Sequence, residues 1–326
     1  MNAYEREHVR DIISRNRKID KAINDAMKDL SRRYTTVKGK RFASIMNERL
    51  AQLHDQILND GKDGIKNQWL LANTMNNKGL DGYLAGVKIS DSMMQSFRSP
   101  NLGALNAFID RAEKGMNLSD RVWNFTDGIK DEVESLIKQG VLEGKSAITL
   151  SKELKGFING KPIRYEGGLI SGKKLIYQAI RVAATEMNMA FRTSDYLQNS
   201  RLPFVTGVTV NLSAAHPQPD ICDDMAGEYP KGFHFVGWHP NCICYATYDT
   251  MPPEEFVNYI KTGDIDQRRI RQDIPARAQR YIEENGKRYL GYENPPYWLG
   301  DNFKKDLSLK SSVRVEGIKK SIKMIP

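Results

Sequence analysis

The sequence is poor in cysteine and histidine, with three cysteines and five histidines among 326 residues. An odd number of cysteines argues against a complete disulfide framework, which leaves metal ligation or ordinary buried thiols. The chain also lacks a hydrophobic run near the roughly 18 residues that a membrane span requires. Residues 1–8 lack the apolar core of a secretory signal. These absences predict a protein that is made in a reducing cytoplasm and does not enter a membrane.

Acidic residues are outnumbered at both ends of the chain, and the formal net charge is +9. Residues 1–60 hold 13 Lys and Arg against 9 Asp and Glu, and residues 302–326 hold 7 against 2. Two basic regions flanking a neutral body suit a polyanion such as nucleic acid. The alternative is that these cations only solvate exposed helix faces and a terminal tail.

Apolar residues recur at steps of three and four along much of the chain, which is the period of an amphipathic helix. This pattern predicts helices over residues 4–34, 42–57, 65–75, 118–139, 146–158 and 173–198, and from Pro252 and Pro275 onward. The polar clusters 59–61 and 76–79 are expected to end the second and third helices. Alternating apolar residues over 205–210, 233–236 and 243–248 predict three short strands.

The predicted fold is mainly α (α+β), a multi-helix body with a small antiparallel β-module near residues 203–250. Turn signals divide the chain into an N-terminal helical region at 1–102, a core at 103–250, a C-terminal helical segment at 251–301 and a basic tail at 302–326. The glycine-rich stretch 159–172 is expected to be a loop, and the aromatic stretch 294–299 is expected to be extended. The tail is expected to be mobile or ordered by a partner.

All three cysteines and three of the five histidines fall between residues 216 and 244. If Cys242 and Cys244 lie on a strand, their side chains share one face, and a turn at Pro240 brings His239 toward them. Cys222 closes the set from the preceding loop. A Cys3His set of this kind is typical of a closed, tetrahedral structural Zn2+ site, which a chain without a large local core can use to fasten its loops. The predicted metal ligands are therefore Cys222, His239, Cys242 and Cys244.

Other polar residues of this stretch are expected to assist the site rather than to form it. His216, Asp220 and Asp224 are reserve ligands or hydrogen-bond partners of the ligands, and His234 is a supporting residue.

Two alternatives to a structural metal site remain open. The cysteines can be ordinary buried thiols of a small sheet. A catalytic site is the other, with Cys222 and His239 as a nucleophile pair or Glu228 as a base. No His-Glu-x-x-His helix is present, and Arg181 and Glu186 are interpreted as surface charges. The sequence therefore predicts no enzymatic activity and no catalytic residue.

Several motifs together carry a resemblance to a known family. They are Leu118-Ser-Asp-Arg-Val-Trp123, Gly140-Val-Leu-Glu-Gly144-Lys-Ser146, Thr185-Glu186-Met-Asn-Met-Ala190, Asp220-Ile-Cys222-Asp223 and His239-Pro-Asn-Cys242-Ile-Cys244. Over roughly residues 110–250 the chain resembles the Mu F-like minor head proteins of tailed bacteriophages. The segment Pro295-Pro-Tyr-Trp-Leu-Gly-Asp-Asn302 is similar to versions from phages and prophages of Bacteroides-type hosts. Ala184 and Ile243 depart from the family pattern, which often has arginine at both places.

The resemblance implies a minor head protein that acts in head morphogenesis and lies inside the capsid near the portal. Its partners would be portal and capsid proteins, with nonspecific contact between the basic terminal regions and packaged double-stranded DNA. Such a protein is made in the host bacterial cytoplasm and resides in the virion. The alternatives are a metal-dependent enzyme or toxin-like effector, and a zinc-containing nucleic-acid-binding module that acts outside the virion.

Overall fold

The computed structural model describes residues 3–37, 39–111, 118, 122, 126, 128–136, 145–146, 148–149, 152–153, 163–165, 168–170, 172–214, 216, 219–240, 242–292 and 295–313. They form the predicted mainly helical protein with small antiparallel sheets. Two compact units can be distinguished: unit 1 is Met1–Lys66 with Asn106–Met187, and unit 2 is Asn67–Leu105 with Asn188–Pro326. These units differ from the four regions predicted from the sequence, 1–102, 103–250, 251–301 and 302–326, and that division remains a prediction.

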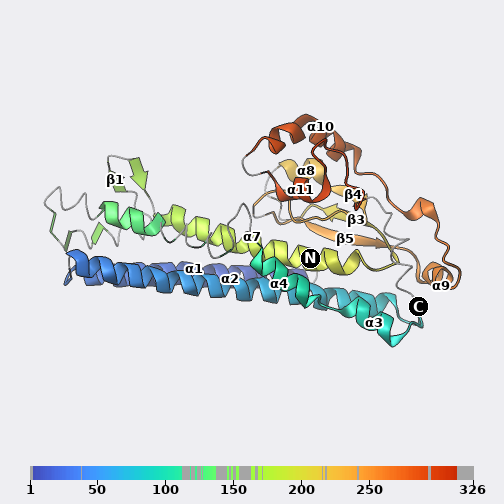
Figure 1. Ribbon diagram of the computed structural model, residues 1–326, viewed down its shortest axis with the longest axis horizontal. Helices are drawn as coiled ribbons and strands as arrows, with labels where there is room; N and C mark the ends of the chain where they lie inside the picture. The colour runs from blue at the N-terminus through green and yellow to red at the C-terminus, as the bar shows by residue number, and fades with distance from the viewer. Residues whose placement is uncertain are drawn as a thin grey trace. The chain divides into compact units, whose positions relative to one another are not determined.

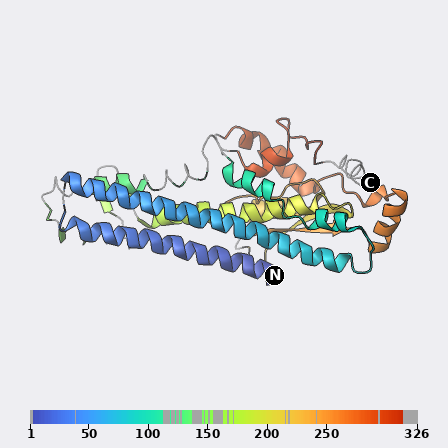
Figure 2. The same ribbon diagram turned by 60° about the horizontal axis from the view of Figure 1, so that its bottom comes forward.

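Unit 1 contains a hairpin of two long helices that run side by side (Figures 1 and 2). They are α1 (Ala3–Tyr34), where a helix over 4–34 was predicted, and the first part of α2 (Gly39–Tyr83). Their buried faces carry the apolar residues that predicted them, including Ile19, Ile23, Leu30, Met46, Leu50 and Leu53. Tyr34 and Phe42 meet edge to face across the hairpin turn, with ring centroids 4.9 Å apart.

The predicted end of the second helix at residues 59–61 is wrong, because α2 continues through it. Close packing explains why the glycines of this stretch do not end the helix. A Cβ atom on Gly64 would lie 2.5 Å from Met187 Sδ and 3.0 Å from Arg15 Cδ. Arg15 also donates to the carbonyl of Asp60 at 3.0 Å. The glycine therefore makes room for side chains that cross α2.

The other described parts of unit 1 bury Leu118, Val122, Ile129, Val133 and Leu136, and Trp123 lies outside the described residues. The stretch predicted as a loop contains an antiparallel hairpin of β1 (Ile163–Tyr165) and β2 (Gly168–Ile170). Glu186 is not a surface charge, because it is 3% exposed and accepts from Arg111 at 2.7 Å.

In unit 2 a polar seam joins the second part of α2 to α7 (Gly172–Asn199), the helix predicted over 173–198. Asn73 donates to Gln198 Oε1 at 2.8 Å, and Gln198 donates to Asn77 Oδ1 at 2.7 Å. Asn76 donates to Asp195 Oδ1 at 2.9 Å. The asparagines predicted to end a helix at 76–79 instead pair with α7, so that prediction is wrong as well. Two short helices follow α2, namely α3 (Asp91–Arg98) and α4 (Leu102–Asp110).

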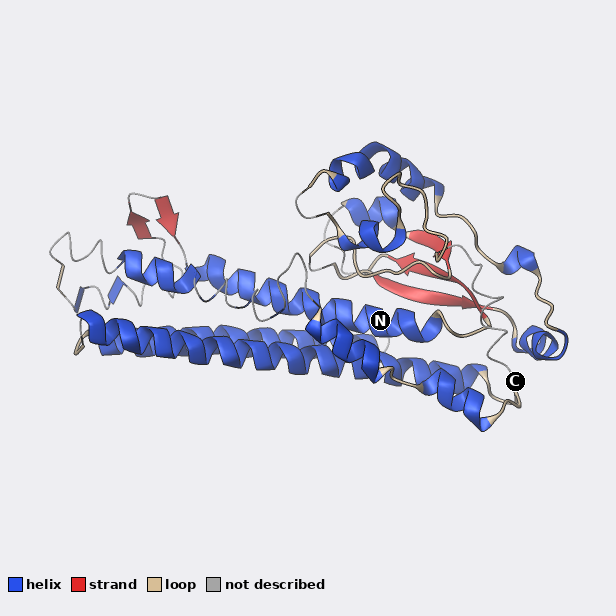
Figure 3. Cartoon of the chain, in the orientation of Figure 1, coloured by secondary structure: helices blue, strands red, loops and turns tan. Residues whose placement is uncertain are grey.

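Unit 2 also contains a three-stranded antiparallel sheet in the order β4-β3-β5, drawn in red in Figure 3. The strands are β3 (Val205–Asn211), β4 (Gly227–Pro230) and β5 (Tyr245–Thr250). Val208 pairs with Tyr229 on one side and Tyr248 on the other. The first and third predicted strands match β3 and β5, whereas the strand predicted over 233–236 is wrong. Its apolar residues Phe233, Phe235 and Val236 are buried, but they lie in a loop and not on a strand.

The remaining elements of unit 2 are α8 (Ile221–Met225), α9 (Pro253–Thr262), the 3-10 turn η1 (Gln267–Arg269), α10 (Ala276–Leu290) and α11 (Tyr297–Asn302). The helices predicted from Pro252 and Pro275 are confirmed. The extended aromatic segment is wrong from Tyr297 onward, where α11 begins. One apolar core includes Leu80, Phe97, Phe204, Val205, Met251 and Phe256.

The described part of the basic tail, residues 302–313, is folded within the chain, whereas the last 20 or so residues were expected to be mobile or ordered by a partner. Phe303 forms an isolated bridge with Leu309, and Val313 is 2% exposed. Residues 314–326 lie outside the described part of the chain. Among the described residues, no helix combines the length and apolar character needed to cross a membrane.

Candidate metal centre

Cys222 lies in the first turn of α8, a helix capped by Asp220. Asp220 Oδ1 accepts from the backbone N–H of Cys222 at 2.7 Å, and Asp223 Oδ2 accepts from the N–H of Asp220 at 2.8 Å. This reciprocal capping box satisfies N–H groups that the first helical turn leaves unpaired. Cys222 is 1% exposed, so the capped turn fixes a thiol in the interior of the protein.

Cys242 and Cys244 come immediately before β5 and do not lie on it, which corrects the predicted strand position. The N–H of Cys242 closes a turn to the carbonyl of His239 at 3.2 Å. Both cysteines are buried, at 1% and 2% exposed, whereas Ile243 between them is 44% exposed. The two thiols therefore turn inward together, as expected, but a turn and an irregular segment position them.

Side chains from three separate segments meet at Cys222. Its Sγ atom lies 3.2 Å from His239 Nε2 and 3.9 Å from Cys242 Sγ. The ligand atoms of Cys222, His239 and Cys242 all lie within 4.8 Å of one another, and so do those of His216, Cys222 and Cys244. Cys222 belongs to both groups. The three cysteines and two histidines lie close together and could bind a metal ion of the soft or borderline class.

The two histidines differ in how their rings are oriented. His239 Nδ1 lies 2.8 Å from the carbonyl oxygen of Pro240. Because a carbonyl only accepts hydrogen bonds, Nδ1 is the donor in this contact, and Nε2 is the ring nitrogen that faces Cys222. His216 Nε2 instead lies 3.0 Å from Asp223 Oδ2. The ring of His239 is thus already oriented as a metal ligand requires.

Carboxylates line the outer side of the cluster. Asp220 Oδ2 lies 3.3 Å from His239 Nε2, and Asp220 Oδ1 lies 3.6 Å from His216 Nε2. Asp223, rather than the predicted Asp224, is the second carboxylate beside His216. Asp224 accepts from Arg277 at 2.9 Å instead.

The thiols interact so strongly that they do not titrate alike. The pKa of Cys242 lies well below its usual range, because Cys222 and Cys244 donate hydrogen bonds to it and Arg192 adds positive charge. Donation to Cys242 and Cys244, together with burial, holds the pKa of Cys222 well above its usual range. For Cys244, the hydrogen bond with Cys222 lowers the pKa, but the bond with Cys242 and burial raise it to about 11. The protein alone therefore favours one thiolate, and a divalent cation would deprotonate the others.

Arg192 is the functional residue that sequence reasoning missed. It lies on α7, is 8% exposed and donates to three backbone carbonyls, those of Val236 at 3.0 Å, Cys242 at 2.6 Å and Cys244 at 2.7 Å. Its guanidinium also lies 4.9 Å from the ring centroid of Phe235. The fork geometry of arginine suits several carbonyls at once. Arg192 thus fixes the backbone of both inward-turned cysteines.

Gly237 allows this close approach of the arginine to the loop. Its φ angle is +109°, and a Cβ atom there would lie 2.5 Å from Arg192 Nη1. Both the backbone conformation and the available space require glycine. The glycine beside the motif was visible in the sequence, but its partner on a helix 45 residues earlier was not.

The helix α11 fastens the other side of the loop. Asn302 is fully buried, accepts from the N–H of His234 at 2.7 Å and donates to its carbonyl at 2.9 Å. Trp298, 1% exposed, donates to the carbonyl of Trp238 at 3.2 Å. The tryptophan that could have stacked on bases therefore packs within its own unit.

His234 stands apart from the metal cluster. Its ring stacks on Tyr196 at 4.5 Å, with Nδ1 3.3 Å from Asp301 Oδ2 and Nε2 3.2 Å from Thr193 Oγ1. None of the described candidate ligand groups includes it. Its supporting role is to connect α7, the loop and α11.

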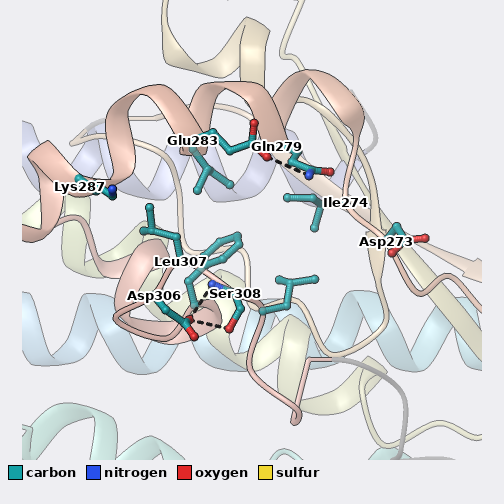
Figure 4. A pocket seen from close by; sticks show the side chains of 11 residues that line it. Asp273, Ile274, Gln279, Glu283, Lys287, Asp306, Leu307 and Ser308 are labelled. Atoms are coloured by element: carbon teal, nitrogen blue, oxygen red, sulfur yellow. Dashed lines mark hydrogen bonds between the residues drawn. The ribbon is translucent and has the colours of Figure 1, made fainter.

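A pocket also lies in unit 2, between α10 and the segment after α11 (Figure 4). Its polar lining is largely paired internally: Gln279 donates to Glu283 at 3.0 Å, and Ser308 donates to Asp306 through both its N–H and its hydroxyl. The cysteine cluster does not line this pocket. Among the residues that the structure describes, the candidate metal centre brings together all three cysteines, His216 and His239.

Neither a family model, nor a curated protein, nor a solved structure matches this chain. The cluster itself therefore carries the functional argument.

Proposed function

We propose that Cys222, His239, Cys242 and Cys244 bind one Zn2+ ion as a structural site. Three cysteine thiolates and one imidazole form a closed tetrahedral set that leaves no position for substrate. The burial of all three thiols, with Cys222 common to two groups of candidate ligands, supports this proposal. The positive charge of Arg192 would offset the excess negative charge of three thiolates around a divalent ion.

His239 is the proposed fourth ligand because its Nε2 atom lies 3.2 Å from Cys222 Sγ and its Nδ1 atom is engaged by the carbonyl of Pro240. His216 is the alternative, since it groups with Cys222 and Cys244. The Nε2 atom of each histidine lies near a carboxylate of the capping box, but His216 Nε2 is closer to Asp223, at 3.0 Å, than His239 Nε2 is to Asp220, at 3.3 Å. We therefore assign His216 to the hydrogen-bonded surroundings of the site.

The proposed role of the ion is to fasten α8 to the segment that leads into β5. The sheet beside it has three strands of only four to seven residues. A small sheet of this kind gains little stability by itself. Metal binding adds directly to the folding free energy of such a module. A fastened, non-enzymatic module is consistent with a structural protein.

For the whole protein we propose a structural role in the head of a tailed bacteriophage, as a minor head protein inside the capsid near the portal. The observation that carries this proposal is local. The Asp-Ile-Cys-Asp and His-Pro-Asn-Cys-Ile-Cys motifs, which bear the resemblance to Mu F-like proteins, supply all three cysteines and His239 to two groups of candidate ligands that share Cys222. The proposed partners are portal and capsid proteins, and packaged double-stranded DNA through the basic terminal regions.

Mass spectrometry of purified procapsids and DNA-filled heads tests this role. The expected result is this chain at low copy number relative to the major capsid protein in both particles, and its loss from particles assembled without the portal. Its absence from both kinds of particle would overturn the proposal. A chain found only in the soluble lysate, bound to specific DNA sequences, would favour the nucleic-acid-binding module outside the virion.

A further inference from the structure

The exposed face of α1 carries a regular line of cations. Arg6, Arg10, Arg17, Lys21, Lys28 and Arg32 are all exposed and follow steps of four and seven residues in turn. The pairs 6/10, 17/21 and 28/32 therefore repeat every eleven residues, which is close to three turns of an α-helix. Successive pairs lie on one line parallel to the helix axis. We call these six residues the α1 track.

Acidic residues are absent from this line and lie beside it. Glu7 and Asp25, and likewise Asp11 and Asp29, are eighteen residues apart, which is five helical turns. They form a neighbouring line between the track and the buried face. Asp11 pairs with the buried Arg15 at 3.2 Å, and Asp29 pairs with Arg33 at 2.8 Å. The charges of Asp11 and Asp29 are thus directed away from the track.

Lys21 of the track has an acidic partner on the same helix. Lys21 lies 2.9 Å from Asp25, and both side chains are largely solvent-exposed. An exposed pair of this kind contributes little energy and is readily exchanged for another anion. Lys21 can therefore still contribute to an anion-binding surface.

The spacing of the track fits a double helix. Residues four apart are separated by about 6 Å along the axis, and the pairs repeat every ~16 Å. A duplex turns once in about 34–36 Å, and each of its two phosphate backbones passes a given side once per turn. A helix that lies along one side of the duplex therefore meets a phosphate backbone every ~17 Å on average. The three cation pairs of α1 can each face one of three successive backbones.

We propose that the α1 track binds double-stranded DNA lengthwise, through phosphates and without reading sequence. This deepens the proposed contact with packaged DNA and identifies the residues that make it. The arrangement differs from a merely solvated helix face in its regular pairs and in the exclusion of acids from one line. Contacts between the cations and the phosphates release counterions from the DNA, so the binding affinity depends steeply on the salt concentration.

The test measures fluorescence anisotropy of labelled 30-base-pair duplexes of two unrelated sequences with the full chain over a salt series. Six track cations predict a slope of log K against log salt near −5. The variant Arg10→Gln/Arg17→Gln/Lys28→Gln should reduce the steepness by about 2.7, at roughly 0.9 per charge. A six-base-pair hairpin spans ~20 Å and should also give a shallower slope, because it reaches fewer pairs.

The matched control is Lys40→Gln/Lys62→Gln/Lys66→Gln, which removes three exposed charges of α2 in the same unit. It should leave the slope nearly unchanged, and circular dichroism melting should show that both variants are folded. The proposal would be overturned if the control variant lost as much of the salt dependence as the track variant, or if the wild-type slope were shallower than about −2. The proposal would also be overturned if polyglutamate or anionic vesicles bound as tightly as the duplex and lost the same affinity in the track variant. Mass spectrometry of heads measures the presence of the chain independently. A negative result for DNA binding by the α1 track would therefore not decide the proposed role in the virion.

Discussion

The α1–α2 hairpin of unit 1 and the cysteine-containing module of unit 2 are stabilised in different ways. The hairpin buries a continuous apolar stripe, so its stability is spread over many similar residues such as Ile19, Leu30 and Leu53. The module between Cys222 and Cys244 depends instead on a few contacts that occur once, at Cys222, Arg192 and Asn302. Single substitutions should therefore disturb the module far more than the hairpin.

The largest effect is expected from Cys222→Ser, because Cys222 belongs to both ligand groups. Elemental analysis of wild-type protein purified without added metal should find about one zinc per chain, and the variant should lose it. We expect a loss of about 5 kcal/mol in the unfolding free energy of unit 2, out of the ~10–16 kcal/mol typical of a structural Zn2+ site. Urea unfolding followed by tryptophan fluorescence measures it.

Ile243→Ser is the matched control, since Ile243 lies in the same loop but is 44% exposed. It should retain zinc and change stability by less than about 0.5 kcal/mol. A Cys222→Ser protein that keeps a full equivalent of zinc would contradict the ligand set. Wild-type protein that melts unchanged after zinc is removed would contradict the structural role.

The next effect is expected at Arg192. Arg192→Met leaves the carbonyls of Val236, Cys242 and Cys244 without their donor and removes the cation beside the thiolates. A cost of about 3–5 kcal/mol and a weaker zinc affinity in chelator competition should follow. Arg192→Lys keeps the charge but not the fork, so it should recover zinc affinity more than stability. Arg181→Met, exposed on the same helix, should change neither.

Asp195 tests a smaller and pH-dependent contribution in unit 2. Burial raises the pKa of Asp195 to about 7, although hydrogen bonds from Asn76 and Asn199 lower it. The carboxyl group in the unfolded chain ionises near pH 4. The folded state therefore holds the extra proton between pH ~4 and ~7, and stability falls as pH rises through that window. Above it, the buried carboxylate destabilises the fold.

Asp195→Asn keeps the acceptor oxygen and removes the ionisation. The variant should match the wild type at pH 5 and be more stable at pH 8 by at most about 3 kcal/mol, because two pH units separate pH 5 from the folded pKa. Urea unfolding at the two pH values measures this difference. Asp81→Asn changes an exposed carboxylate that pairs with Arg98, and it should show no such gain. Equal pH dependence in Asp195→Asn and wild type would contradict the raised pKa.

The two regions also differ in what the sequence could predict. The apolar period located α1 and α7 because it recurs over many residues. The cysteine cluster was visible because cysteine is scarce and all of it lies in one stretch. Arg192 and Asn302 were not visible, because their partners are backbone atoms of a loop 44–68 residues away. Backbone partners leave no trace in the side-chain pattern.

The turn signals were misread for a related reason. Asparagine and glycine favour turns when their local chemistry decides the conformation. In α2 they serve neighbouring helices instead: Asn73, Asn76 and Asn77 pair with α7, and Gly64 admits Met187. Apolar residues over 233–236 likewise indicated burial correctly but a strand wrongly, since an aromatic cluster that includes Trp238 and Trp298 covers them.

The two glycines of the hairpin give the smallest predicted effect and the most direct check of its packing. Gly64→Ala places a Cβ 2.5 Å from Met187 Sδ, and the buried methionine must move, at a cost of about 1–2 kcal/mol. Among the described residues, a Cβ in Gly61→Ala meets Leu118 Cδ2 alone, at 3.9 Å, so helix propensity should make the variant stabilising by about 0.5–1 kcal/mol. Thermal melts of the two variants should shift in opposite directions. A stabilising Gly64→Ala would mean that α2 is not packed against Met187, and the hairpin would then lose its reason for a glycine there.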